Sequence, residues 1–202
     1  MKKNEILNSC YTKSVEAYMG GLGYEGSNSK SGLYGSELTK KFREIAKVCK
    51  IKGVSFSKSR SGAINITVKI TEDDIVPYEK IANTIENASF LRINMGGCKK
   101  DPTDPKKWIA ASDFWGMTAA EQKNALKFWA KEWYEQTTNG YTGCICHGWQ
   151  LKPEEYVCFN EKFFDKWNAL TKIVSSFNWD NSNAMVDYFD VHFYEHWYIV
   201  KK

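Results

Sequence analysis

The chain has 202 residues, of which 43% are hydrophobic and only four are proline, so we expect a globular protein with a buried core. No apolar run reaches the roughly 18 residues that span a bilayer, and the basic opening at residues 1–8 lacks the apolar stretch of a signal peptide. We therefore expect a cytoplasmic protein without membrane contact, whose six cysteines stay reduced. The net charge of +4 is unevenly spread, because residues 36–70 hold nine basic and two acidic side chains.

The glycine- and serine-rich segment 19–30 predicts a mobile loop, and no GxxxxGK[ST] pattern follows it that would indicate a phosphate-binding P-loop. Ser36 can then cap a helix that ends at Gly53. Apolar residues at helical spacing predict its buried face: Leu38, Phe42, Ile45 and Cys49. Basic residues recur on another face: Lys40, Arg43, Lys47 and Lys50.

A hairpin is predicted after this helix. Residues 54–58 alternate like a strand, residues 59–62 form a turn, and residues 63–70 alternate strictly. The apolar side of the second strand is Ile64, Ile66, Val68 and Ile70. Thr71 and the three carboxylates after it favour a helix that continues to about Asn87. We expect residues 36–90 to form a basic α-β-β-α module, in which helices cover one face of a small antiparallel sheet in an α+β fold.

Residues 91–160 are expected to form a Trp-rich insert of helical and irregular structure. Within it, Thr118 and Glu121 make a capping box that starts a helix to about Thr137. A secondary basic row recurs on this helix: Lys123, Lys127 and Lys131. A solvated face is the favoured interpretation of this row, because Glu135 continues it with the opposite charge.

Residues 161–202 should close a single compact domain that spans residues 1–202. We expect a helix from Pro153 to about Ser176, with Phe163, Phe164, Trp167 and Leu170 as its apolar positions. A β-rich segment from about Asp190 to Val200 predicts a last strand, which needs a partner edge. That strand should lie beside the 54–70 hairpin.

Metal binding is not predicted. Cys144, Cys146 and His147, followed by Cys158, offer four soft ligands, but C-x-C-H matches no common zinc framework. His192 and His196 are four residues apart, and in a strand this spacing separates them by roughly 13 Å.

Catalysis is not predicted either. No cysteine is flanked as in a cysteine protease. Asp180, Asp187 and Asp190 do not have the spacing of an EF-hand loop and fit the capping of a turn. We therefore expect no cofactor and no enzymatic activity, with a small hydrolase or metal protein as the remaining alternative.

Two blocks of the sequence carry a family resemblance. The first consists of residues 38–47, 52–57 and 64–68 (LTKKFREIAK, KGVSFS and INITV). The second consists of residues 177–183 and 187–194 (FNWDNSN and DYFDVHFY). These two blocks resemble the large polyvalent-protein-associated domain, type 29. The insert is not part of this pattern.

The resemblance implies a protein of a phage, plasmid or conjugative element that acts in a bacterial host cell, with an anti-defence or DNA-associated role and no catalytic residues. We therefore expect an inhibitor that binds a host defence protein, such as a CRISPR effector or a restriction enzyme, and blocks it sterically. The alternative is an accessory protein that binds nucleic acid. Either partner would contact the basic residues of the module: Lys40, Arg43, Lys47, Lys50, Lys58 and Arg60.

Overall fold

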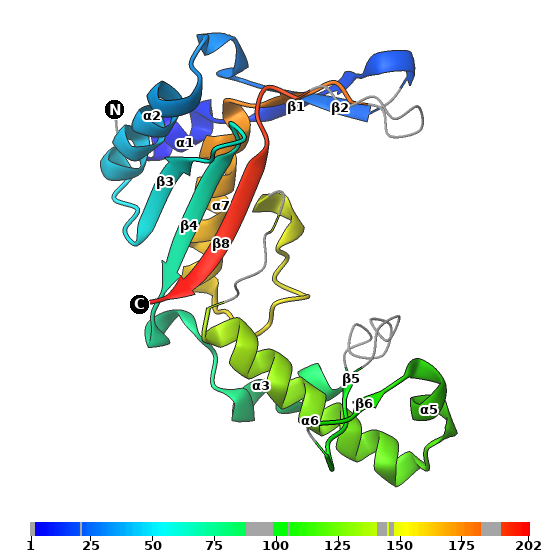
Figure 1. Cartoon of the computed structure of the whole chain (residues 1–202). Coiled ribbons are helices and arrows are strands. Elements are labelled where there is room, and N and C mark those ends of the chain that lie inside the picture. Colours follow the sequence, from blue (N-terminus) through cyan, green and yellow to red (C-terminus); the bar gives the residue numbers. More distant parts are fainter. Residues whose placement is uncertain are drawn as a thin grey trace.

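The computed structural model describes residues 3–20, 22–87, 99–104, 106–140, 145, 148–182 and 191–202. These residues form an α+β fold, as the sequence predicts. A three-stranded sheet backed by helices lies at its centre, and a second, mainly helical lobe extends from one end of that sheet (Figure 1). No helix within the described ranges is both long and apolar enough to span a bilayer.

The central sheet combines the predicted hairpin with the last strand of the chain. In spatial order its strands are β3 (Val54–Lys58), β4 (Ile64–Ile70) and β8 (Glu195–Lys201). The expected pairing of the closing strand with the hairpin is confirmed. β3 and β4 run antiparallel, whereas β4 and β8 run parallel, so the sheet is mixed rather than wholly antiparallel. The long connection between β4 and β8 allows this, because it can return the chain to the starting end of the sheet.

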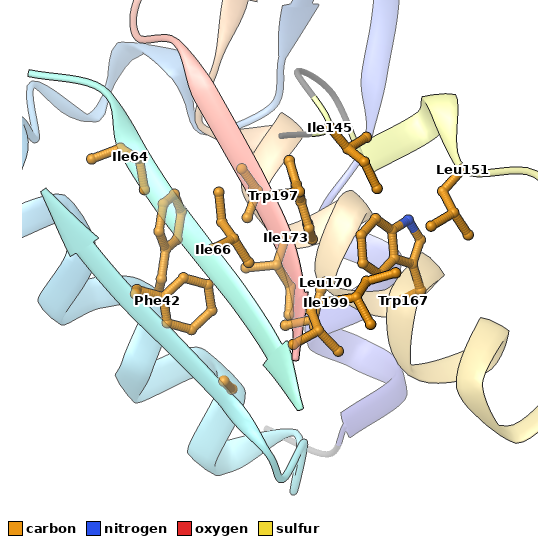
Figure 2. Packing of buried hydrophobic residues seen from close by; sticks show 14 of the residues in the cluster. Phe42, Ile64, Ile66, Ile145, Leu151, Trp167, Leu170, Ile173, Trp197 and Ile199 are labelled. Carbon is orange, nitrogen blue, oxygen red and sulfur yellow. The ribbon is translucent and has the colours of Figure 1, made fainter. Parts of the chain in front are cut away.

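Two helices pack on one face of the central sheet, α2 (Gly35–Val48) and α7 (Glu161–Ser176). The alternating side chains of β4 that were expected inside the protein are completely buried: Ile64, Ile66, Val68 and Ile70. Figure 2 shows Ile66 between Phe42 of α2 and Trp197 of β8, within one cluster of buried side chains. The rings of Trp167 and Trp197 lie 4.9 Å apart between centroids, so α7 packs directly against the last strand.

Helix α2 begins earlier than expected. Tyr34 is its N-cap residue, and Ser36 lies in the first turn, where its main-chain carbonyl accepts a hydrogen bond from the Thr39 hydroxyl at 2.9 Å. The predicted apolar face is confirmed, because Leu38, Phe42 and Cys49 are buried and Ile45 packs against the core at its margin.

A second sheet lies at the other end of the molecule from the helical lobe (Figure 1). It contains β1 (Thr12–Glu16), β2 (Leu22–Gly26) and β7 (Trp179–Asp180), and the short helix α1 (Lys3–Ser9) precedes it. The prediction of a mobile loop at residues 19–30 is therefore wrong. The glycines serve close packing: a Cβ atom at Gly23 would collide with the carbonyl of Asp180, and one at Gly26 with the carbonyls of Ser175 and Ser176.

The helical lobe differs from the predicted module. Thr71 and Asp74 form a capping box around the 3-10 turn Glu72–Asp74, and the chain then stays extended up to Pro77. The helix α3 (Tyr78–Glu86) starts only after this proline, because a residue before proline disfavours helical geometry. α3 packs against α6 (Ala119–Thr138) instead of covering the sheet.

Short elements complete the lobe: β5 (Lys99–Lys100), β6 (Trp108–Ile109) and α5 (Ala111–Gly116). The start of α6 is confirmed, since Thr118 and Glu121 form the expected capping box. The lobe has its own hydrophobic cluster around Trp129, and the side chains of Ile81, Trp133 and Tyr134 pack against both this cluster and the main core. The two cores are thus joined by shared side chains.

The segment before α7 was expected to be helical from Pro153, but α7 begins only at Glu161. Asn160 caps it by accepting a hydrogen bond from the main-chain N–H of Phe163 at 3.1 Å. Residues 153–158 form turns instead, and Phe159 pairs with Ile75 in an isolated bridge, beside which the N–H of Val76 donates to the carbonyl of Cys158 at 2.9 Å. The last strand also starts later than predicted, at Glu195, and Asp190 lies outside the described residues.

Candidate functional site

A groove of about 870 Å³ lies where the start of β3, the end of β4 and the first turns of α7 meet. Lysine side chains dominate its lining: Lys3, Lys50, Lys52, Lys69, Lys162, Lys166 and Lys202. Its acidic side chains are Asp74, Glu161 and Asp165. Lysines therefore outnumber carboxylates seven to three, and we call this surface the lysine groove.

A smaller hollow of about 380 Å³ continues the lysine groove along the edge of the sheet. The two hollows share Lys50, Ile51 and Lys52. The smaller one adds Arg43 and Lys47, which α2 presents beside β3. The basic residues thus form one continuous surface around the C-terminal end of α2.

Lys50 holds an unusual backbone position at the centre of this surface. The N–H of Lys50 donates to the carbonyl of Lys47 at 3.1 Å, and the N–H of Ile51 donates to that of Ala46 at 2.9 Å. These two bonds define a Schellman motif, in which the residue after the C-cap adopts left-handed geometry and is usually glycine. Lys50 occupies that position with φ of 56°, which strains any residue that has a Cβ atom. Backbone strain of this kind is concentrated at functional sites.

Some lysines of the groove already have partners in the fold. The Lys166 ammonium lies 3.5 Å from a carboxylate oxygen of Asp74 and donates to the carbonyl of Lys69 at 3.0 Å. Its side chain is only 17% exposed, so it serves the fold. Lys162 reaches Asp73 at 3.5 Å, but both side chains are largely exposed.

The lysines at the mouth of the groove differ from these two. Within the described part of the chain, Lys50, Lys52 and Lys69 form no ion pair, and all three are exposed. Their ammonium groups therefore remain available to an anion.

The basic residues predicted from sequence fall into two groups. Arg43, Lys47 and Lys50 lie together on the continuous surface, and Lys40 is exposed one turn before Arg43 on α2. Lys58 and Arg60 lie at the opposite end of α2, about 20 Å away by the length of a 14-residue helix. Lys58 lines a separate hollow of about 430 Å³ with Gly35 and Ser61.

The secondary basic row is exposed on α6, in the helical lobe rather than at the groove: Lys123, Lys127 and Lys131. Lys131 pairs weakly with Glu135, at 4.0 Å. Most of the groove lysines were not predicted from the sequence. Lys52 and Lys69 belong to the basic segment 36–70 and could have been included, whereas Lys3, Lys162, Lys166 and Lys202 come from distant parts of the sequence and carried no signal.

Only some of the residues considered for metal binding lie within the described part of the chain. Cys144, Cys146 and His147 lie outside the described residues, and so do Asp187 and Asp190. Cys158 is buried, and this burial raises the pKa of its thiol to about 12. In the described ranges no three side chains of the His, Cys, Asp or Glu type come together as metal ligands would.

The two C-terminal histidines occupy different environments. His192 lies before β8, where its Nδ1 atom is 2.8 Å from the carbonyl oxygen of Phe177. His196 lies within β8, opposite Asn65 of β4.

No protein-family model, curated protein or solved structure matches this chain. The resemblance to the large polyvalent-protein-associated domain, type 29, therefore stays a prediction from the two sequence blocks.

Proposed function

We propose that this protein binds a nucleic acid through its phosphate backbone, which occupies the lysine groove, and that it does so without catalysing a reaction. The proposal rests on one observation: lysines from distant parts of the sequence line the same groove. They come from α1, from the β3–β4 region, from α7 and from residue 202. A polyanion that follows the groove and its continuation would contact Lys47, Lys50 and Lys52 in succession.

The electrostatics of the groove favour a polyanion over a single charged group. A surface that serves only solubility usually carries positive and negative side chains in mixture. This groove instead presents Lys50, Lys52 and Lys69 without carboxylate partners in the described chain. Binding of DNA or RNA to such a surface releases the counterions condensed on the phosphates. The affinity should therefore fall steeply as the salt concentration rises.

Anisotropy of a fluorescent DNA duplex, measured at several salt concentrations, tests the proposal. We expect a linear log–log plot, with a slope near −0.9 for each phosphate neutralised. The triple variant K47E/K50E/K52E should lose most of the affinity and flatten the slope. The matched control K123E/K127E/K131E makes the same change in net charge on α6 and should bind nearly as well as the unmodified protein. Equal loss in both variants, or no binding at all, would overturn the proposal.

The anti-defence role implied by the family resemblance stays a separate prediction. An inhibitor that reaches a defence enzyme through the nucleic acid would lose inhibition in the groove variant, whereas one that binds the enzyme through another surface would keep it.

A further inference from the structure

The hollow that contains Lys58 lies at the opposite end of α2 from the lysine groove, and its volume is about 430 Å³. The start of α2, the end of β3, the turn after β3 and the segment before β8 line it. No carboxylate of the described chain is among its lining residues. We call it the tyrosine hollow, because the exposed rings of Tyr34 and Tyr194 belong to its lining.

The two tyrosine rings are held differently. The ring of Tyr34 stands edge-on against that of His192, with centroids 4.7 Å apart, so it forms a fixed wall. The main-chain carbonyl of Tyr194 accepts a hydrogen bond from the N–H of Ile64 at 2.8 Å, which attaches this residue to the sheet. Its side chain is 56% exposed and, within the described chain, forms no hydrogen bond and no ring contact. The Tyr194 ring is therefore open to a planar group.

Lys58 brings a positive charge to the tyrosine hollow. A Cβ atom at Gly35 would lie 3.2 Å from Cδ and 3.5 Å from Nζ of Lys58, so the lysine side chain lies across the start of α2. Lys58 is exposed and forms neither an ion pair nor a hydrogen bond with any described residue. An ammonium group beside an open aromatic ring favours a ligand that is both planar and anionic, as a nucleotide is.

A row of side chains on α2 joins the tyrosine hollow to the basic surface at the other end of the helix. Spacings of four, three and four residues place its members on one helix face: Ser36, Lys40, Arg43 and Lys47. Ser36 lines the tyrosine hollow, whereas Arg43 and Lys47 line the hollow that continues the lysine groove. The carboxylates of α2, Glu37 and Glu44, lie about a quarter turn away from this row. A polyanion that follows the row thus runs from one hollow to the other beside basic side chains.

We propose that the tyrosine hollow receives an unpaired nucleotide at the end of the nucleic acid that occupies the lysine groove. Its base stacks on Tyr194, and its phosphate contacts Lys58. This inference rests on the proposed function of the groove and names the substrate class, a duplex with a single-stranded tail. The 14 residues of α2 separate the two hollows by about 20 Å, which corresponds to about six nucleotides of one strand.

The geometry favours an unpaired nucleotide over a base pair. Bases within a duplex are stacked on both faces and their phosphates lie on the outside, so Tyr194 cannot reach a base face there. An unpaired nucleotide can turn its base out of the stack while its phosphate stays beside the ammonium group. Arg60, two residues after Lys58, is exposed and forms no ion pair in the described chain, so it offers a second cation for a flanking phosphate.

Anisotropy of fluorescent DNA probes tests the inference: a blunt duplex, and the same duplex with a short thymidine tail at its 3′ or its 5′ end. The unmodified protein should bind one of the tailed duplexes about tenfold more tightly than the blunt one, because a base stacks on the ring. Tyr194→Ala should remove this advantage without changing the affinity for the blunt duplex. Tyr194→Phe keeps the ring and should retain the advantage. Tyr11→Ala should retain it too, because it removes a similarly exposed tyrosine that lines a different hollow.

Lys58→Gln provides a second test, based on charge. For the preferred tailed duplex, this variant should reduce the slope of log affinity against log salt by about 0.7, the value for one phosphate of a single strand. The slope for the blunt duplex should stay the same. Lys123→Gln on α6 is the matched control and should leave both slopes unchanged.

The outcomes separate this inference from the function of the groove. If the blunt and tailed duplexes bind equally, or if the advantage of the tail survives both Tyr194→Ala and Lys58→Gln, the inference fails, while K47E/K50E/K52E still tests the groove. If the unmodified protein binds no probe, the proposed function fails as well. Should Tyr194→Ala lower the melting temperature, the exposed Lys58→Gln and its Lys123→Gln control still decide.

Discussion

The guanidinium group of Arg43 reaches across the open edge of the central sheet, where its Nη2 atom donates to the main-chain carbonyl of Phe56 at 2.5 Å. β3 is an edge strand, so this carbonyl has no neighbouring strand to bond. Arg43 therefore does two things at once, because it satisfies the sheet edge and contributes positive charge to the hollow beside the lysine groove.

We expect Arg43→Ala to lower the free energy of unfolding by about 1 kcal/mol, because the mutation removes a hydrogen bond from a charged donor. Lys47→Ala, on the same face of α2, should change it by less than about 0.5 kcal/mol, since the Lys47 side chain has no bonding partner in the described chain. Both variants should weaken binding of a DNA duplex. Urea denaturation gives the stabilities, and equal stability of the two variants would contradict a structural role for Arg43.

At Lys50 we expect a single mutation to raise stability while it lowers binding, whereas Arg43→Ala should lower both. Glycine adopts its left-handed backbone without strain, so Lys50→Gly is expected to raise the free energy of unfolding by about 1 kcal/mol. The same change removes an ammonium group from the groove and should reduce affinity for nucleic acid. A variant that gains stability while it loses binding would mean that the strain is retained for function.

The neighbouring Lys52 provides the control for Lys50. Its φ is not positive, so Lys52→Gly removes the same charge without relieving strain. Chemical denaturation should show no gain in stability for this variant. Stabilisation by both glycine variants would point to relief of charge repulsion as the cause.

The sequence predicts those parts of the fold that depend on local periodicity. The two-residue alternation of Ile64 to Ile70 and the helical spacing of Leu38 and Phe42 each identified a buried face. Local patterns failed where a distant segment decides the structure. Gly23 looks flexible in sequence, but its missing side chain lets Asp180 approach.

The residues of the candidate site also fall into those that local sequence patterns predict and those that only distant packing brings together. Arg43, Lys47 and Lys50 could be identified because they share one helix face and its end. Lys162 and Lys202 join the groove only through the packing of α7 and β8, which no local spacing encodes. Lys58 and Arg60 are near Lys50 in sequence, yet the antiparallel course of α2 and β3 carries them to the other end of the helix.

Glu195 is expected to matter for the stability of the last strand. This buried carboxylate accepts hydrogen bonds from Nε1 of Trp197 at 2.7 Å and from Nδ2 of Asn178 at 3.3 Å. Glu195→Leu leaves the indole N–H of Trp197 unpaired and removes one of two acceptors of Asn178 Nδ2, which still donates to the carbonyl of Phe193 at 3.0 Å. The change should lower the free energy of unfolding by about 3 kcal/mol. Glu195→Gln retains an acceptor oxygen and should lose clearly less. Guanidinium denaturation of both variants measures the difference, and equal losses would show that volume rather than hydrogen bonding is decisive.

Cys158 should make the protein less stable in alkaline solution. Burial raises the pKa of its thiol to about 12 from an ordinary value of 9.0. Between these values the unfolded chain releases the thiol proton while the folded chain keeps it. The folded state then binds more protons, and the free energy of unfolding must fall as the pH rises above about 9. Cys158→Ala removes this contribution, so its stability should decline less steeply between pH 8 and pH 10 than that of the unmodified protein. Parallel declines in urea denaturation would mean that Cys158 titrates normally in the folded state, and rapid labelling of Cys158 by a thiol reagent at pH 8 would show the same.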